Sequence, residues 1–242
     1  MTSLSPELEG FAQFLDAQPE NVQSNCLTGG LDDQVLNGSA ATTGKLKGEE
    51  MDRFFEALKN SKILNPLFNA AGTAMESRFR LWLQDPVKIL QGAEIRPGDT
   101  VLEVGCGTGF FTVPAARLIG EQGRLVAMDV LPAYVERVSQ KTRSANLKNV
   151  RVMEGDALDT GLDAASMDAA MLFGVIPFPL LPLNRLLPEM HRILKPEGIL
   201  AVWLWPPMVH FWVPKSILRS GLFSYVDKRN GVYNYKRYQA GG

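Results

Sequence analysis

The sequence predicts an α/β fold built on a seven-stranded, mostly parallel, doubly wound sheet. Two observations predict it. From residue 99 onward, short apolar runs alternate with segments of helical periodicity, which is the pattern of parallel strands joined by crossover helices. Near the carboxyl end, two strand-like segments flank Asn230-Gly231, a strong signal for a two-residue hairpin, so the sheet is expected to end in an antiparallel pair.

The chain is expected to have two parts, a helical N-terminal extension or lid over residues 1–85 and the sheet domain over residues 86–242. The extension shows apolar residues at helical spacing, interrupted by glycine-rich loop signals. Asp85-Pro86 opens the sheet domain as a helix N-cap followed by proline at the first helical position. Strands are then expected at residues 100–104, 124–129, 150–154, 167–173, 199–203, 222–228 and 232–238, and further helices at 110–119, 132–145 and 183–194.

Composition and charge exclude several classes of protein. With 25 Lys and Arg against 26 Asp and Glu, the net charge of −1 rules out a strongly basic protein that holds nucleic acid by phosphate neutralisation, so no nucleic-acid partner is expected. Two distant cysteines and two histidines leave no disulfide scaffold and no metal site. The sequence shows no signal peptide and no apolar run of the ~20 residues that a membrane span needs, which indicates a soluble, cytoplasmic protein.

The sharpest motif is a strand that runs into a glycine-rich turn, VLEVGCGTG at residues 101–109, and then into a helix. Gly105, Gly107 and Gly109 would let the backbone turn tightly and approach a ligand, and the first N–H groups of the helix would be open to an anionic group. Position 110 is Phe, so the G-x-G-x-x-G fingerprint of dinucleotide-binding proteins is incomplete. A tight strand-to-helix turn without a ligand is the alternative.

Three carboxylates accompany the first three predicted strands. Glu103 precedes the first glycine of the loop by two residues, Asp129 ends the second strand, and Asp156 follows the third. Because the carboxyl ends of the strands in a doubly wound sheet meet at one crevice, these acids are expected to converge there. They would suit a ligand with cationic groups and would repel a pyrophosphate. As alternatives, Asp129 and Asp156 are ordinary strand-end turn residues, and Glu103 is a helix-terminus partner.

Four segments occur in the order and spacing of a known family: VLEVGCGTG, AMD at the end of the second strand, EGDAL after the third, and HRILKPEGIL before the fifth. On these segments, residues 86–242 resemble the class I S-adenosylmethionine-dependent methyltransferases, which have a Rossmann-like fold. Within this family, the sequence most resembles the small-molecule branch of the ubiquinone/menaquinone type. The resemblance implies S-adenosylmethionine as the cofactor, whose two positive groups, a sulfonium and an ammonium, match the three acids.

The resemblance also implies a role for each motif residue. Glu103 would help to hold the amino end of the cofactor, Asp129 would accept hydrogen bonds from both ribose hydroxyls, and Asp156 would take the adenine amino group. Cys106, inside the loop, is either a reactive thiol activated by the helix N-terminus or simply a small residue. The other residues implied in cofactor binding are Gly105, Cys106, Gly107, Thr108 and Gly109 of the loop, Val130, Ala157, whose N–H would meet a ring nitrogen, and Phe173 and Gly174, which would line the reactive end.

Methyl transfer from a sulfonium is an in-line displacement, in which the protein aligns the acceptor with the methyl group and excludes water. A general base is needed only if the acceptor must lose a proton, and the sequence contains no obvious catalytic triad. The catalytic residue is therefore unknown. His210, after the fifth strand, is the candidate base, with packing or an interface as its alternative role, and His191 is expected to be structural.

The methyl acceptor is expected to be a small apolar or aromatic molecule. The Asn/Asp-Pro-Pro-Tyr/Phe motif of nucleobase amino methylation, the glutamate pair of arginine methylation and the cysteines of arsenite methylation are absent. Alternatively, the apolar segments after strands four and five bury against the N-terminal helices or a second subunit, which leaves a homodimer open. The wall that would face the acceptor is Phe173, Ile176, Phe178, Trp203, Trp205, Met208 and Trp212.

Two other functions compete with methyl transfer. One is a nicotinamide-dependent oxidoreductase on a related sheet, against which the incomplete glycine fingerprint and the extra acids argue. The other is a non-catalytic protein that keeps the methyltransferase fold and uses its aromatic surface to bind a partner. The sequence does not say whether an O, N, C or S atom of the acceptor is methylated.

Overall fold

The computed structural model describes residues 85–176, 181–204 and 212–238, all within the second of two units of the chain, Glu50–Gly242. The predicted extension lies almost entirely outside these residues, and its boundary stays a prediction. The strands are β1 (Thr100–Val104), β2 (Arg124–Asp129), β3 (Val150–Glu154), β4 (Met167–Phe173), β5 (Leu194–Trp203), β6 (Phe223–Arg229) and β7 (Val232–Arg237). The helices are α5 (Pro86–Leu90), α6 (Thr112–Ile119), α7 (Pro132–Ser144), α8 (Leu183–Ile193) and α9 (Val213–Arg219).

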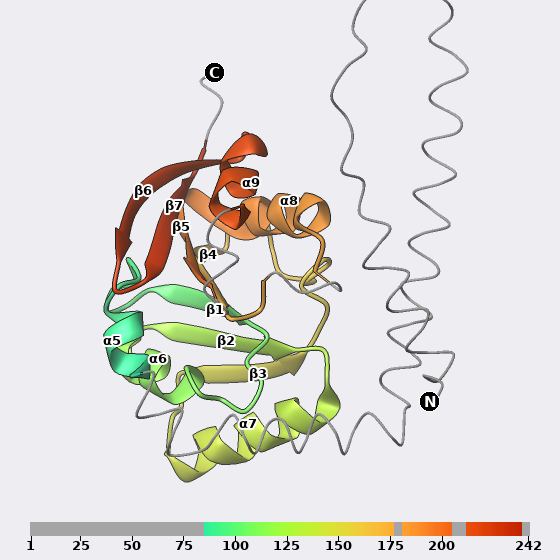
Figure 1. The fold of residues 1–242 in the computed structure, drawn as a ribbon. Coiled ribbons are helices and arrows are strands. Elements are labelled where there is room, and N and C mark those ends of the chain that lie inside the picture. Colours follow the sequence, from blue (N-terminus) through green and yellow to red (C-terminus); the bar gives the residue numbers. More distant parts are fainter. Residues whose placement is uncertain (1–84, 177–180, 205–211, 239–242) are drawn as a thin grey trace, which may run out of the picture. The chain divides into compact units, whose positions relative to one another are not determined.

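The described residues form one seven-stranded sheet with the strand order β3-β2-β1-β4-β5-β7-β6 (Figure 1). The strands β1 to β5 pair in parallel, whereas β7 is antiparallel to both of its neighbours, β5 and β6. The predicted doubly wound, mostly parallel sheet with an antiparallel hairpin at its end is confirmed. The carboxyl ends of β1 to β5 therefore share one edge of the sheet, called the carboxyl edge below.

Four strands, β1 to β4, begin and end where the sequence predicts, and the main differences elsewhere come from packing. Helix α6 begins at Thr112 rather than at residue 110, since Phe111 packs edge-on against Phe173, with ring centroids 5.0 Å apart. Strand β5 begins at Leu194 rather than at residue 199, because Leu194 pairs with Met167 ahead of a register shift. Contacts between distant segments thus move these two boundaries.

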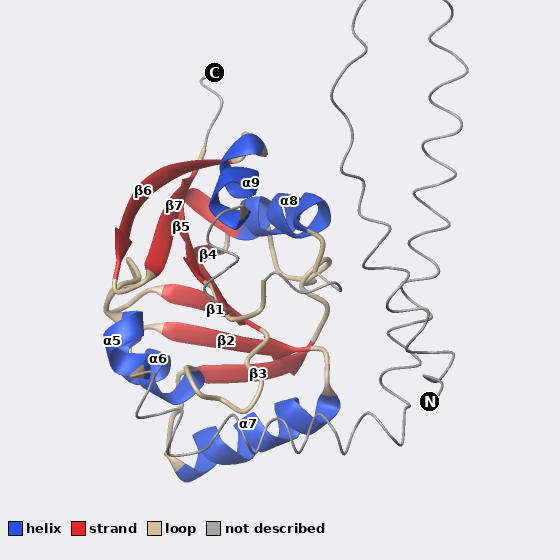
Figure 2. Ribbon diagram, in the orientation of Figure 1, coloured by secondary structure: helices blue, strands red, loops and turns tan. Residues whose placement is uncertain are grey.

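Helices cover both faces of the sheet (Figure 2). Successive side chains of a strand point to opposite faces, so Leu172 of β4 packs in the core with α8 and α9, while Met171 packs in the core with α5 and α6. Both side chains are fully buried, and each contributes roughly 1.5–3 kcal/mol of transfer free energy. In the described residues, no helix combines the length and the apolarity that crossing a bilayer requires.

The hairpin between β6 and β7 turns at Asn230-Gly231, the predicted position. Both residues have left-handed φ angles, 48° and 83°, as a type I′ turn requires. The turn is fastened to the segment around α5, since Asn230 Nδ2 donates to Lys88 O at 2.8 Å and Arg229 pairs with Glu94 at 2.6 Å. The last two strands are therefore tied to the first helix of the domain.

Candidate functional site

The site lies at the carboxyl ends of β1, β2 and β3, which are neighbours in the sheet. The loop between β1 and α6 turns through left-handed φ angles of 65°, 51° and 76° at Gly105, Gly107 and Gly109, where any other L residue would be strained. A Cβ on Gly105 would also lie 2.5 Å from Val175 Cγ1, whereas a Cβ on Gly107 would meet nothing nearer than 4.0 Å. Gly107 thus leaves open space in which a ligand can approach the backbone.

Hydrogen bonds hold this glycine loop in place from β2 and from α7. The N–H groups of Cys106 and Gly107 donate to the end of β2, the second of them to Asp129 Oδ2 at 2.8 Å. On the other side, the Lys141 ammonium donates to Thr108 O at 3.2 Å. The loop backbone is therefore fixed by residues far away in the sequence, which is the kind of support that a preorganised binding site needs.

Glu103, the fourth residue of β1, is a buried acid directly before the loop. It is 3% exposed, and its Oε2 accepts a hydrogen bond from the Thr112 hydroxyl at 2.7 Å. Burial and, to a smaller extent, the charge of Asp129 raise the pKa of Glu103 to about 8, against the opposing effects of Thr112 and Lys141. A cation placed beside this carboxyl group would favour its charged form.

Asp129 closes β2 and is 7% exposed. Its Oδ2 accepts the Gly107 N–H at 2.8 Å, and its Oδ1 accepts the Leu131 N–H at 3.0 Å. Burial raises the pKa of Asp129, and the backbone N–H groups oppose that rise. Because an ionised carboxylate has room for about four donors, Asp129 keeps capacity for further ones, such as the hydroxyls of a ribose.

Asp156 lies at the tip of β3, the neighbour of β2. The Gly155 N–H donates to Asp129 O at 3.1 Å, which ties the tips of the two strands together. Asp156 is partly exposed, and its Oδ1 accepts the Leu158 N–H at 2.8 Å within a short turn. The three acids therefore occupy adjacent strand tips, and their roles toward a ligand stay predictions.

Cys106 is a free cysteine that is 5% exposed. Burial, followed by the negative charges of Glu103 and Asp129, raises the pKa of its thiol. The reactive thiolate is thereby disfavoured. The role of Cys106 as a small residue that fits the loop stays a prediction.

The described members of the expected acceptor wall do not share one surface. Phe173 and Trp203 lie in the core with α5 and α6, where both rings pack edge-on against Phe111, at centroid distances of 5.0 Å and 5.9 Å. Ile176 is 1% exposed in the core on the other face of the sheet, whereas Trp212 is 47% exposed. The remaining residues, Phe178, Trp205, Met208 and the candidate base His210, lie outside the described residues.

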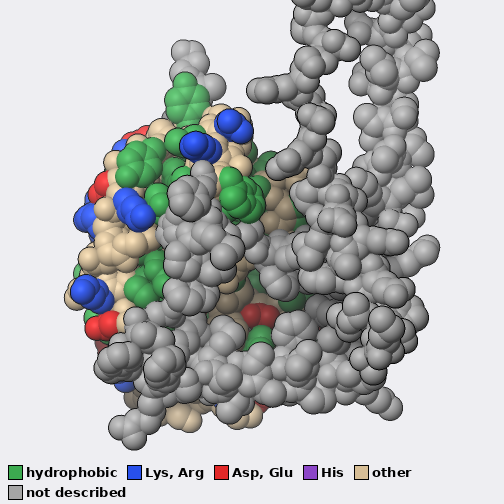
Figure 3. Space-filling model, in the orientation of Figure 1, with side chains coloured by type: hydrophobic (Ala, Val, Ile, Leu, Met, Phe, Trp, Pro, Cys, Tyr) green, Lys and Arg blue, Asp and Glu red, His purple; other side chains and the backbone are tan. Residues whose placement is uncertain are grey.

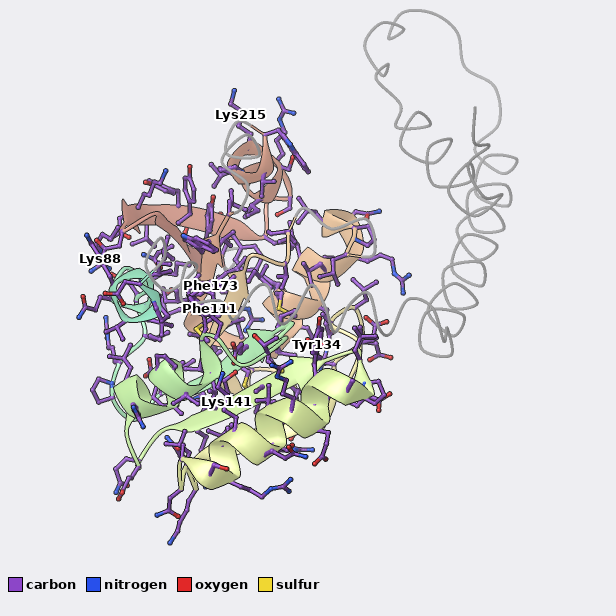
Figure 4. The ribbon with its side chains drawn as sticks, turned by 60° about the horizontal axis from the view of Figure 1, so that its bottom comes forward. Lys88, Phe111, Tyr134, Lys141, Phe173 and Lys215 are labelled. Carbon is purple, nitrogen blue, oxygen red and sulfur yellow. The ribbon has the colours of Figure 1, made fainter. Side chains whose placement is uncertain are left out.

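The two residues expected at the reactive end, Phe173 and Gly174, differ in exposure at the end of β4. Phe173 is 7% exposed and lies beside Phe111 in the core (Figure 4), while Gly174 is exposed at the carboxyl edge. His191, by contrast, has a structural environment: a ring nitrogen lies 2.9 Å from Tyr238 O, and the ring packs edge-on against Phe223.

Sequence reasoning missed three residues that shape the site. Thr112 donates a hydrogen bond to Glu103, and Lys141 donates one to the glycine loop. Tyr134 is a partly buried residue whose pKa is raised by burial and by the charge of Asp129. Tyr134 and Lys141 are two turns apart on α7, with the fully buried Val138 between them, so they follow one face of the helix (Figure 4). This stripe was visible in the sequence, whereas nothing local marks Thr112.

Comparison with known proteins relates this domain to a described family. A family described as "Methyltransferase domain" matches residues 101–198. Demethylmenaquinone methyltransferases of Bacillus cereus and Bacillus anthracis are 30% identical over 122 residues, which are 50% of this chain and 49% of theirs, so the chain spans about half the length of these curated relatives. The solved structure of a SAM-dependent methyltransferase from Aquifex aeolicus has 25% identity and a TM-score of 0.57, over 69% of this chain and 96% of that one.

The fold, the glycine loop and these matches agree on the class of protein. Residues 101–198 match a methyltransferase domain, and the fold and the relatives support a class I S-adenosylmethionine-dependent methyltransferase with a menaquinone-type relative, which implies S-adenosylmethionine as the cofactor. The residues present fit that cofactor. Two buried acids suit its positive groups and its ribose, and the absent side chain at Gly107 leaves room for a close approach to the backbone.

Proposed function

We propose that this chain transfers a methyl group from S-adenosylmethionine to a small, apolar or aromatic acceptor. The observation that carries the proposal is the pair of buried acids, Glu103 and Asp129, beside a loop with three left-handed glycines. Burying negative charge is unfavourable unless positive groups or hydrogen-bond donors compensate it. A cofactor with a sulfonium, an ammonium and two ribose hydroxyls provides both kinds of compensation.

Each residue of the site has a separate task in this proposal. The bound cofactor supplies a methyl group that its sulfonium already activates, and the chain aligns the acceptor and excludes water. Glu103 binds the amino end, Asp129 the ribose hydroxyls, and Asp156 the adenine amino group. The remaining contacts with the cofactor come from the backbone of Gly105, Cys106, Gly107, Thr108 and Gly109. Val130 and Ala157 lie beside the adenine ring, and Gly174 lies at the reactive end with Phe173 beneath it.

Two observations support a small apolar acceptor. The segments that follow β4 and β5 are apolar and rich in proline, and the Bacillus relatives are named for demethylmenaquinone. His210 acts as the base if the acceptor must lose a proton, and otherwise no base is required. The proposal also makes the protein cytoplasmic and without a nucleic-acid partner. Light scattering decides whether it is a homodimer.

Calorimetric titration with S-adenosylmethionine and with its demethylated product tests cofactor binding. We expect Asp129→Ala to weaken binding about tenfold or more, which corresponds to ~1.4 kcal/mol. Glu121→Ala, which removes an exposed acid from the turn before β2, is the matched control and should leave the affinity unchanged. Failure to bind either compound would overturn the proposal. NADH fluorescence that stays constant on mixing would dismiss the oxidoreductase alternative.

A turnover assay then separates an enzyme from a binding protein. We expect transfer of a labelled methyl group from the cofactor to at least one member of a panel of hydroquinones, naphthohydroquinones and phenols. Cofactor binding without transfer to any of them, together with a partner complex in light scattering, would favour the non-catalytic alternative.

A further inference from the structure

The stretch that contains α9, β6 and β7 differs in composition from the rest of the chain. Between residues 212 and 238 there are six Lys or Arg and one acid, Asp227, although the whole chain has a net charge of −1. Six large apolar side chains are exposed among the described residues, and five of them lie in this stretch: Trp212, Leu218, Tyr225, Val226 and Tyr238. Positive charge and exposed apolar area therefore coincide here.

On α9 the exposed residues follow one side of the helix. Trp212, just before the helix, and Lys215, Leu218 and Arg219 are exposed at i, i+3, i+6 and i+7, while Ile217 is fully buried. The outer side of this segment therefore presents an indole, a leucine and two cations to solvent.

Strand β6 extends this surface on the same side of the sheet. Tyr225 lies directly opposite Tyr235, which is buried in the core with α8 and α9, and the two ring centroids are 6.0 Å apart. Residues directly opposite each other on neighbouring strands share a face, so Tyr225 lies on the α9 side. Lys228 lies opposite Tyr233 and holds its ammonium 4.3 Å from the centre of that ring.

The acid of this stretch is turned to the other side of the sheet. Asp227 Oδ1 accepts a hydrogen bond from Asn234 Nδ2 at 2.7 Å, and the same amide donates to Gly92 O, next to α5. We define the cationic–aromatic face as Trp212, Lys215, Leu218, Arg219, Tyr225 and Lys228, a set with three cations and no carboxylate. Figure 3 shows hydrophobic and basic side chains interspersed over the region of α9 and β6.

We propose that the cationic–aromatic face docks on the surface of a bilayer that contains anionic phospholipids. Lys and Arg attract anionic headgroups, Trp and Tyr favour the boundary between headgroups and acyl chains, and Leu218 adds apolar area that can enter this boundary. A second copy of the chain is a poorer occupant, because a two-fold contact would bring like charges together. A nucleic acid is also a poorer occupant, because its phosphates would match the cations but would leave Leu218 without an apolar partner.

Docking by this face has a consequence for the site. Lys228 lies opposite Tyr233, which pairs with Val202 near the carboxyl end of β5, so this part of the face is level with the carboxyl edge. A docked domain would hold that edge close to lipid, in which apolar acceptors dissolve. This consequence rests on the proposed function, whereas lipid binding itself does not.

Co-sedimentation of the full chain with vesicles tests the proposal. We expect binding to vesicles of phosphatidylcholine with phosphatidylglycerol, and at least tenfold weaker binding to phosphatidylcholine alone. The variant K215E/R219E/K228E should lower binding to the anionic vesicles by at least tenfold, since each cation near such a surface contributes about fivefold. Leu218→Ser, which removes apolar area without changing the charge of the face, should also lower binding with all three cations present, which attraction to phosphate alone would not explain.

The matched control is R117E/R124E/K148E, which makes the same change in charge at three exposed cations outside the face and should retain vesicle binding. An equal loss of vesicle binding in both triple variants would overturn the assignment of the face. A wild-type chain that does not bind anionic vesicles would overturn the proposal itself. If the wild-type chain does not bind vesicles, light scattering and RNA titration identify the other occupants. A dimer, or a complex with single-stranded RNA, would then be assigned to the face if only the face variant loses it. Cofactor affinity and thermal melting should be unchanged in all variants, which keeps lipid binding separate from the proposed function.

Discussion

Replacing the buried Glu103 by glutamine should stabilise the ligand-free protein in a pH-dependent way. Burial raises the pKa of this carboxyl group in the folded protein to about 8, from an ordinary value of 4.5. Between these two pH values the folded state keeps a proton that the unfolded state has lost, so wild-type stability falls as the pH rises through this window and levels off above it. The shift corresponds to an upper limit of roughly 5 kcal/mol at 1.36 kcal/mol per pH unit, and we expect a loss of about 2–3 kcal/mol after local relaxation.

Glutamine has the same size, keeps an oxygen that can accept the Thr112 hydroxyl, and carries no charge to bury. Urea unfolding of the wild-type protein and of Glu103→Gln, measured from about pH 4.5 to pH 9, gives the difference in unfolding free energy. This difference should be smallest at the acidic end and should grow in favour of the variant up to about pH 8. Asp129, whose pKa is also raised, is present in both proteins and largely cancels. A difference that does not change with pH would refute the reasoning.

The same substitution links protonation to the cofactor. A positive ammonium beside Glu103 favours its charged form, so cofactor binding near neutral pH should release a proton into the buffer. Calorimetric titrations in buffers of different ionisation enthalpy measure this release. Glu103→Gln should abolish it and weaken binding about tenfold, whereas an undiminished release would mean that another group titrates.

Two further substitutions test contacts that the sequence did not reveal. Lys141→Met removes the donor to Thr108 O and should weaken cofactor binding about threefold to tenfold in calorimetry, with little change in the unfolding midpoint because Lys141 is exposed. Lys141→Arg should retain most of the affinity. If Lys141→Met binds the cofactor as tightly as the wild type, Lys141 does not hold the loop. Asn234→Ala removes the hydrogen bonds of a fully buried amide with Asp227 and with the backbone beside α5, so urea unfolding should show a loss of about 2–4 kcal/mol. Ser224→Ala, at an exposed position of β6, should change the unfolding free energy by less than about 0.5 kcal/mol, and a loss in Asn234→Ala no larger than this would refute the importance of the amide.

Elements that depend on near neighbours in the sequence could be predicted from it. The runs of apolar residues mark the bounds of β1 to β4 residue for residue. Asp85 caps α5 by accepting the Val87 N–H at 2.9 Å, and Asn230-Gly231 forms the hairpin turn. Each of these features rests on interactions that span only a few residues, which a sequence pattern records directly.

Much of the candidate site was also within reach of the sequence. The glycine loop is contiguous, and parallel strands bring their carboxyl ends to one edge, so the acids Glu103, Asp129 and Asp156 could be assigned to neighbouring strand tips. The direction of Phe173 was less accessible. It depends on which face of β4 packs against Phe111, a contact between residues 62 positions apart.

By itself, then, the sequence determined the α/β class, the hairpin, the glycine loop and the three acids, because their signals are local or follow from the geometry of any parallel sheet. Only the tertiary structure decided that Lys141 fastens the loop, that Thr112 donates to a carboxyl group with a raised pKa, and that Cys106 is buried and has a pKa raised by burial and by the charges of two acids. The physical reason is that burial and hydrogen bonding set these properties. Both depend on elements that the fold brings together from distant parts of the chain, and no short pattern of residues records them.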